Sequence, residues 1–290
     1  MLISVQTKIA GVIGDPISHS LSPKLHNYLL EKYAIDGIYM PLKISPKDLE
    51  LCLNFMIKAG FKGCNVTIPH KEAAYQLCHK RSIEAELIGA VNTIIITEKQ
   101  ELYGHNSDGI GFINNIKNHF PEFDFNNKKA VVLGSGGASR AICYALMQQK
   151  IGKIILTNRN FERAEKMIQD FTKIPEFKTS SLSISPWPKR EEILSDCDLL
   201  INTTSLGMQN GEELKMDLAN LNKNALVCDI IYKPLMTELL NLAQSRGNKI
   251  VTGIGMLINQ ALVGFEAWYG VKPEVDQRLT DQMIVWSKNS

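Results

Sequence analysis

A single lysine in the first half of the chain is placed where it could carry protons. Lys71 follows the stretch NVTIPH at residues 65–70, in which Val66 and Ile68 are β-branched residues typical of a strand. Pro69 has no N–H for a strand ladder, so it predicts that the strand ends just before the lysine. Ligands of open α/β sheets bind outside the carboxyl ends of the strands, where a lysine can act as a general acid or base. A solvated surface lysine is the competing interpretation of Lys71 on its own.

A glycine-rich turn in the second half of the chain could bind a phosphate. It lies between an apolar strand pattern and a helix pattern and consists of Gly134, Ser135, Gly136, Gly137 and Ala138. Glycines in this position let the backbone approach a pyrophosphate at the helix N-terminus. Ser139 stands where the dinucleotide fingerprint usually ends in glycine or alanine, so the motif is only partly met. The strand–turn–helix context still favours a dinucleotide site over a turn that binds nothing.

The end of the next predicted strand indicates which dinucleotide would bind. An acidic residue at this point typically binds the ribose hydroxyls of NAD, whereas a cation binds the 2′-phosphate of NADP. Here the strand tip carries Asn158 and Arg159, followed by Arg163. The planar guanidinium group suits phosphate because it donates two parallel hydrogen bonds. We therefore expect NADP rather than NAD, the alternative being that both arginines are solvated charges at a helix start.

Composition narrows the class of protein. The 32 lysines and arginines nearly balance the 30 aspartates and glutamates, which argues against a nucleic-acid partner held by net charge. Six scattered cysteines without a C-x-x-C pair predict reduced thiols in a cytoplasmic protein. The six histidines show no metal-binding spacing, so no metal site is expected. No apolar run approaches the length of a membrane span, so no membrane association is expected.

Strand and helix patterns alternate around Lys71. We expect a strand leading to this lysine, and further strands at residues 8–14, 38–43, 93–97 and 102–105. The last two would form a hairpin, which makes the first sheet mixed. Ser22-Pro23 and Ser45-Pro46 each have the pattern of an N-cap followed by the first residue of a helix.

The second half of the chain alternates more regularly. A strand precedes the glycine turn, and others are expected at residues 153–157, 199–202, 225–229 and 249–252. Helix patterns lie between them, which predicts a parallel sheet with helices on both faces. The tail from Gly255 has only helical patterns, interrupted at Pro273. Because no strand follows, we expect this tail to pack back on another part of the protein.

Nine blocks of the sequence together resemble the shikimate dehydrogenase family. They are GDPISHSLSPKLHN (14–27), NVTIPHK (65–71), GAVNT (89–93), GHNSDGIGF (104–112), GSGGASRA (134–141), NRNFERA (158–164), NTTSLGM (202–208), DIIYKP (229–234) and GIGMLINQALVGFEAW (253–268). Their number, order and spacing cover almost the whole chain. Ser107 departs from the family, which more often has threonine there, but the hydroxyl is kept.

The resemblance implies an α/β protein of two domains. A mixed, mainly parallel α/β substrate-binding and catalytic domain would comprise residues 1–108 with 254–290, and a Rossmann-type NADP-binding domain residues 109–253. The implied reaction is the reversible, NADPH-dependent reduction of 3-dehydroshikimate to shikimate in aromatic amino acid biosynthesis.

The resemblance also assigns residues. Lys71 and Asp108 would be the catalytic pair. The substrate would be bound by Ser20, Ser22, Thr67, Lys71, Asn92, Asp108, Tyr232 and Gln260. The cofactor would be bound by Gly134, Ser135, Gly136, Gly137, Ala138, Asn158, Arg159, Arg163, Thr203, Ile230, Gly253 and Met256.

Physical chemistry supports several of these roles while leaving alternatives open. Ser20 and Ser22 lie at a predicted helix N-terminus, where hydroxyls, free N–H groups and the helix dipole can hold a carboxylate. Ser22 could equally be a plain N-cap, and Asp108 a turn residue before Gly109. For Tyr232, where a strand meets a turn, packing is as reasonable a role as substrate binding.

Two other functions remain compatible with the sequence. One is a quinate/shikimate dehydrogenase with broader substrate and cofactor use. The other is an NADP-binding regulator that keeps the fold without the activity, against which the presence of both Lys71 and Asp108 argues. We expect a small-molecule substrate and a monomer or homodimer.

Overall fold

The computed structural model describes residues 3–174 and 182–289 and divides into two compact units. Unit 1 consists of Met1–Asp108 with Ile258–Trp286, and unit 2 of Gly109–Leu257 with Ser287–Asn289. The boundaries fall within helices α5 (Asp108–His119), α9 (Gly253–Tyr269) and α10 (Gln277–Asn289).

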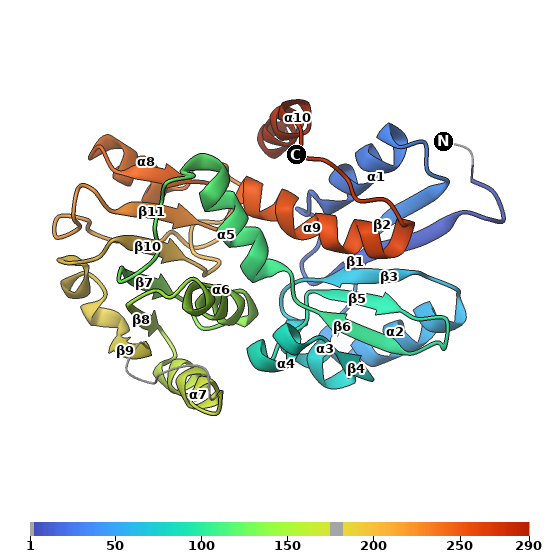
Figure 1. The fold of residues 1–290 in the computed structure, drawn as a ribbon, viewed down its shortest axis with the longest axis horizontal. Coiled ribbons are helices and arrows are strands. Elements are labelled where there is room, and N and C mark those ends of the chain that lie inside the picture. Colours follow the sequence, from blue (N-terminus) through green and yellow to red (C-terminus); the bar gives the residue numbers. More distant parts are fainter. Residues whose placement is uncertain (1–2, 175–181, 290) are drawn as a thin grey trace. The chain divides into compact units, whose positions relative to one another are not determined.

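Unit 1 contains a six-stranded sheet in the order β2-β1-β3-β5-β6-β4 (Figure 1). Its strands are β1 (Lys8–Gly14), β2 (Gly37–Lys43), β3 (Gly63–Val66), β4 (Lys80–Arg81), β5 (Thr93–Ile96) and β6 (Leu102–His105). β1 pairs in parallel with β2 and β3, whereas β5 is antiparallel to β3 and β6. The sheet is therefore mixed, which confirms the prediction from the hairpin pattern.

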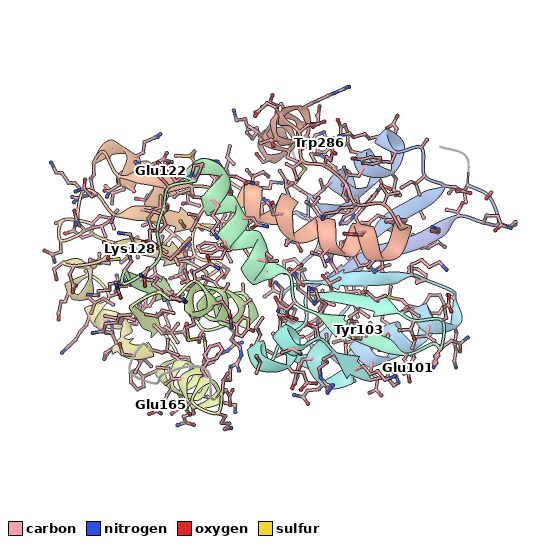
Figure 2. All side chains as sticks on the ribbon, in the orientation of Figure 1. Glu101, Tyr103, Glu122, Lys128, Glu165 and Trp286 are labelled. Atoms are coloured by element: carbon pink, nitrogen blue, oxygen red, sulfur yellow. The ribbon has the colours of Figure 1, made fainter. Side chains whose placement is uncertain are left out.

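The two-residue strand β4 was not predicted. Lys80 pairs with Tyr103 of β6, and its Nζ donates a hydrogen bond to Glu101 Oε2 at 2.7 Å. Glu101 and Tyr103 are labelled in Figure 2. Two residues are too few to show the alternating pattern of a strand. This strand forms because it pairs with its neighbour, which its own sequence does not indicate.

Two helices of unit 1 begin at other residues than the sequence predicts. They are α1 (Ser22–Lys32), α2 (Leu49–Lys58), α3 (Lys71–Leu77), α4 (Ile83–Ile88), the later part of α9, and α10 (Gln277–Asn289), which ends in unit 2. Ser22 is the first helical residue rather than the N-cap: buried Leu21 takes the cap position in a right-handed conformation, without a side-chain cap. Ser45-Pro46 opens a short 3₁₀ turn, Pro46–Asp48, and α2 begins only at Leu49.

The end of helix α9 packs on the sheet of unit 1. Trp268 Nε1 donates to the Ile94 carbonyl at 3.0 Å, and Tyr269 Oη donates to the Ile38 carbonyl at 3.0 Å. Both side chains are at most 3% exposed. The strandless tail is therefore held by buried aromatic contacts and by hydrogen bonds to two strands.

The described residues of unit 2 form a sheet of six parallel strands in the order β12-β11-β10-β7-β8-β9. They are β7 (Lys129–Leu133), β8 (Lys153–Asn158), β9 (Leu182–Pro186), β10 (Leu199–Asn202), β11 (Leu226–Asp229) and β12 (Lys249–Val251). Its described helices include α6 (Gly137–Gln148), α7 (Phe161–Phe171) and α8 (Glu238–Ser245), besides most of α5 and the first residues of α9. The strand order reverses between β7 and β10, which is the topological switch point of a Rossmann-type sheet. The predicted fold class, α/β with a mixed sheet and a Rossmann-type sheet, is confirmed.

A buried carboxylate lies at the end of β11. Asp229 is 2% exposed and accepts hydrogen bonds from the Asn202 amide, the Thr237 hydroxyl at 2.8 Å and the Ile231 N–H at 3.0 Å. Burial raises the pKa of Asp229 to about 6, although these donors oppose the shift. The network links β10, β11 and the start of α8.

This raised pKa predicts a pH dependence of stability. Because folded Asp229 binds its proton more tightly than the unfolded chain does, its contribution to stability is complete below about pH 4 and is lost as the pH rises through about 6. We expect wild-type protein to lose on the order of 2 kcal/mol across this window relative to Asp229→Asn, which cannot titrate. Urea unfolding of both proteins between pH 4 and 7 measures the difference, and parallel profiles would contradict it.

Candidate active site

Lys71 and Asp108 form an ion pair in unit 1. Lys71 Nζ donates a hydrogen bond to Asp108 Oδ2. The side chain of Lys71 is 17% exposed and that of Asp108 is 5% exposed. Lys71 is the first residue of α3 and Asp108 the first of α5, so two helix starts present the two charges to each other.

Asn92 holds the second oxygen of the carboxylate. Its Nδ2 donates to Asp108 Oδ1 at 2.8 Å and is also 3.3 Å from Gln260 Oε1. Its Oδ1 accepts from the Ser107 N–H at 2.9 Å and from the Thr93 hydroxyl at 2.9 Å. Asn92 is 1% exposed, so this network fixes the orientation of Asp108 within the protein interior.

Ser107 connects the same network to α9. Its Oγ donates to the Gln260 carbonyl at 2.9 Å. The side chain is fully buried. Its Oγ also lies 3.1 Å from Asn92 Nδ2 and 3.2 Å from Asn92 Oδ1, so the serine hydroxyl takes part in the network at the position where the family more often has threonine.

The backbone of the central strands brings these residues together. The Val66 N–H at the end of β3 donates to the Asn92 carbonyl at 2.8 Å. The Val91 N–H donates to the Lys71 carbonyl at 2.9 Å, so the residues just before β5 contact the start of α3 directly. Lys71 thus lies past the carboxyl end of β3, as its sequence context predicts.

Three other predicted substrate residues of unit 1 lie after strands, Ser20 and Thr67 in turns and Ser22 at the start of α1. Ser20 is half-buried, and its Oγ accepts from the Ser22 N–H at 3.3 Å, so it satisfies a free N–H at the start of α1. Ser22 is 5% exposed. Thr67 is half-buried after β3, and its N–H donates to the Ile13 carbonyl of β1 at 2.9 Å. Tyr232 belongs to unit 2, where it is half-buried after β11.

The glycine turn of unit 2 is built at the switch point of its sheet. Gly134 has φ +109°, which favours glycine, and an added Cβ would lie 2.6 Å from Thr203 Oγ1. Ser139 is fully buried, and its Oγ donates to the Gly134 carbonyl at 2.7 Å. The serine that departs from the fingerprint therefore closes the turn with a hydrogen bond of its own.

The turn fits a dinucleotide pyrophosphate. Ser135 Oγ is buried and finds no hydrogen-bond partner among residues 3–174 and 182–289. Next to it, a Cβ built on Gly136 would meet no atom within 4 Å, so there is open space at the N-terminus of the 12-residue helix α6. An unpaired hydroxyl, free N–H groups and open space are the features that an anion requires here.

The other predicted cofactor residues lie just after β10 and β11 and in α9. Thr203 Oγ1 donates to the Leu133 carbonyl at 2.6 Å and so joins β10 to β7. Gly253 lies close to β11, since an added Cβ would be 2.2 Å from the Ile230 carbonyl oxygen. Met256 is 6% exposed in α9.

The predicted 2′-phosphate residues lie at the tip of β8 and the start of α7. Asn158 Nδ2 donates to the Asn160 carbonyl at 2.8 Å, and Asn160 caps α7 by accepting from the Arg163 N–H at 2.9 Å. Arg159 makes a two-pronged ion pair with Glu212, with distances of 2.7 and 2.6 Å. Hydrogen bonding by Arg159 lowers the pKa of Glu212. Sequence reasoning missed this acid because it lies 53 positions along the chain, with no local signal.

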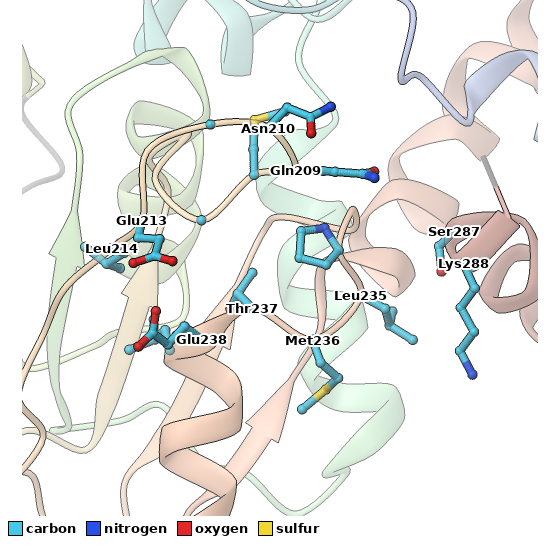
Figure 3. Close-up of a pocket in the computed structure, with 15 residues that line it drawn as sticks. Gln209, Asn210, Glu213, Leu214, Leu235, Met236, Thr237, Glu238, Ser287 and Lys288 are labelled. Carbon is cyan, nitrogen blue, oxygen red and sulfur yellow. The ribbon is translucent and has the colours of Figure 1, made fainter.

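A separate pocket of about 730 Å³ lies in unit 2, away from the glycine turn in sequence (Figure 3). It is lined by loop residues 207–211 and 213–214, by residues 234–239, which run into the start of α8, and by Ser287 and Lys288. It shares no residue with the predicted substrate or cofactor sets.

Two family models match this chain. Residues 12–94 match the family model described as "Shikimate dehydrogenase substrate binding domain", and residues 115–232 match "Shikimate / quinate 5-dehydrogenase". The chain belongs to the shikimate dehydrogenase family.

Individual members of the family match along nearly their whole length. A protein of Acidiphilium cryptum named "Shikimate dehydrogenase (NADP(+))" is 45% identical over 280 residues, 96% of each chain. The shikimate dehydrogenase structure from Aquifex aeolicus has a TM-score of 0.86 at 34% identity and covers 98% of this chain and 99% of its own. That from Thermus thermophilus, in complex with NADP(H) and shikimate, has a TM-score of 0.82 at 30% identity, with coverage of 98% and 99%.

Two negative findings apply to the described part of the chain. Among residues 3–174 and 182–289 no group of histidine, cysteine, aspartate and glutamate side chains is arranged to hold a metal ion. Within the same ranges, no helix has the length and apolar character that crossing a bilayer requires.

Proposed function

We propose that this protein catalyses the reversible, NADPH-dependent reduction of 3-dehydroshikimate to shikimate. The observation that carries the proposal is the Lys71–Asp108 ion pair with its Asn92 support, found in a chain of the shikimate dehydrogenase family. The reaction requires a hydride at a ketone carbon and a proton at its oxygen.

Lys71 is the proposed source of the proton. An ammonium next to the substrate oxygen stabilises the negative charge that develops there and then donates its proton, while the reverse reaction returns the proton to the amine. Because the side chain is 17% exposed, solvent can reprotonate it between turnovers.

Asp108 and Asn92 orient the lysine and the substrate. The carboxylate keeps the ammonium in place through one oxygen, and its other oxygen is fixed by Asn92. Asp108 is also proposed to accept a hydrogen bond from a substrate hydroxyl. Thr67, Asn92, Tyr232 and Gln260 would complete recognition of the hydroxyls.

The ring carboxylate of the substrate is assigned to the start of α1. Ser22 is the first residue of an 11-residue helix, and Ser20 lies just before it. Hydroxyl groups and free N–H groups at such a start favour an anion. In this proposal unit 1 is the substrate-binding and catalytic domain.

Unit 2 is the proposed NADP-binding domain. NADPH supplies the hydride when bound. The residues of the glycine turn, from Gly134 to Ala138, would hold its pyrophosphate, and Asn158, Arg159 and Arg163 its 2′-phosphate. Thr203, Ile230, Gly253 and Met256 would line the rest of the dinucleotide site.

The proposal also covers the cellular compartment, the oligomeric state and the partners of the protein. We place it in the cytoplasm, where its six free cysteines, five of them buried, stay reduced. It would act as a monomer or homodimer on a small molecule, without a nucleic-acid partner.

Substrate and cofactor preference test the proposal. We expect oxidation of shikimate with NADP⁺ to exceed in kcat/KM both oxidation of quinate with NADP⁺ and oxidation of shikimate with NAD⁺, by roughly tenfold or more. Steady-state assays of the four combinations measure this. Comparable efficiency with quinate would favour a quinate/shikimate dehydrogenase, and tight NADPH binding without any turnover would favour a regulator.

Replacement of Lys71 tests the proton donor. Lys71→Ala should lower kcat by roughly 10²–10⁴-fold, because proton transfer by a positioned side chain contributes that much, and should barely alter KM for shikimate. Lys58→Ala is the control, since Lys58 is an exposed lysine at the end of α2 in the same unit. If Lys71→Ala stays folded and turns over at nearly the wild-type rate, Lys71 is not the proton donor.

A further inference from the structure

The arginine assigned to the 2′-phosphate of NADP already has an anionic partner within the protein. Arg159 Nη1 donates to Glu212 Oε2 at 2.7 Å, and Nη2 donates to Oε1 at 2.6 Å. Both donors on this face of the guanidinium group are thereby used. The two side chains are 50% and 65% exposed, so solvent and small ligands can reach the pair.

The loop that carries Glu212 is held in place by its own backbone. The Gly207 N–H donates to the Glu212 carbonyl at 2.7 Å, and the Gly211 N–H donates to the Met208 carbonyl at 2.9 Å. The Gln209 N–H donates to the Lys233 carbonyl at 3.0 Å, which ties the loop to the segment after β11. The carboxylate therefore meets Arg159 from a preformed turn rather than from a loose chain.

Arg159 is also positioned by an aromatic residue near the strand tip. Its guanidinium carbon lies 5.9 Å from the centre of the Trp187 ring. Arg190 packs over the same ring at 5.0 Å, and its Nη2 donates to the Lys215 carbonyl at 3.0 Å, three residues beyond Glu212. The strand tip and the Glu212 loop are thus linked through a shared aromatic residue.

A phosphate and a carboxylate cannot use the same guanidinium face at once. A phosphate seeks the two parallel hydrogen bonds that Glu212 now accepts. Two anions sharing the site would also repel each other, and water screens this repulsion only in part. A 2′-phosphate that takes these two hydrogen bonds must therefore displace Glu212 from Arg159, whereas a ribose with a free 2′-hydroxyl makes no such demand.

We propose that Glu212 is an intramolecular competitor for the 2′-phosphate site and so sets how tightly this protein binds NADP relative to NAD. The inference rests on the proposed function, because it takes NADP as the cofactor and Arg159 as a 2′-phosphate ligand. Removal of the carboxylate frees the arginine for the phosphate. Affinity for a cofactor without this phosphate does not depend on the exchange.

Isothermal titration calorimetry of the ligand-free protein tests the proposal without measuring activity. NADP⁺ and NAD⁺ are titrated into wild type, Glu212→Gln and Glu213→Gln, and the fragments 2′,5′-ADP and 5′-AMP isolate the phosphate. Glu213 is the matched control, because it is an exposed neighbour whose replacement removes the same charge.

The expected result is specific to one charge and one phosphate. Glu212→Gln should bind NADP⁺ and 2′,5′-ADP roughly two- to fivefold more tightly, the range that exposed ion pairs usually carry, with NAD⁺ and 5′-AMP unchanged. Glu213→Gln should match wild type with all four ligands.

Three outcomes would overturn the inference: unchanged or weaker binding of NADP⁺ by Glu212→Gln, an equal gain in Glu213→Gln, or weaker binding of NAD⁺ by Glu212→Gln. The last would mean that Glu212 accepts a hydrogen bond from the ribose. Failure of wild type to prefer NADP⁺ over NAD⁺ would instead count against the cofactor assignment itself, which separates the two claims.

Discussion

The interaction on which unit 1 depends is a nearly buried ion pair. A charge removed from water is costly unless it is paired and hydrogen-bonded, and removal of one partner leaves the other uncompensated. Asp108 meets this condition through Lys71 on one oxygen and Asn92 on the other. Asn92 is fixed in turn by Ser107 and Thr93. The network gives the lysine a defined position, which is what proton donation to a substrate requires.

In unit 1 the charged groups of the site are paired with each other. In unit 2 the proposed cofactor site must instead leave hydrogen-bond donors unpaired, so that they can bind an anion. The reversal of strand order between β7 and β10 leaves room at the strand ends, and Gly134 turns the chain there with a positive φ. The Ser139 hydroxyl donates a hydrogen bond to the Gly134 carbonyl of the turn. Ser135 keeps a buried hydroxyl without a partner in the described parts of the chain. At the tip of β8, by contrast, two donors of Arg159 are not available to an anion, because they are hydrogen-bonded to Glu212.

Features that depend on a short stretch of sequence could be predicted. Features that depend on a contact with a residue far away in the sequence could not. The end of β3 follows from Pro69, and the two sheets follow from strand spacing and the hairpin pattern, because these depend on local backbone chemistry. Ser22 was wrongly predicted as an N-cap, because the helix starts one residue earlier, with the buried apolar Leu21 in the cap position, where no capping side chain marks it in the sequence. The Arg159–Glu212 pair joins two exposed residues on different loops, and nothing in either stretch indicates the other.

The central claim is that the Lys71 ammonium, held by Asp108, meets the substrate oxygen that is protonated. The most direct test is a crystal structure of the protein with shikimate bound. We predict that Lys71 Nζ lies within hydrogen-bond distance, roughly 2.6–3.2 Å, of the ring hydroxyl on the carbon that is oxidised, while it keeps its contact with Asp108. A lysine turned away from that hydroxyl, with the oxygen bound by another protein group, would contradict the account.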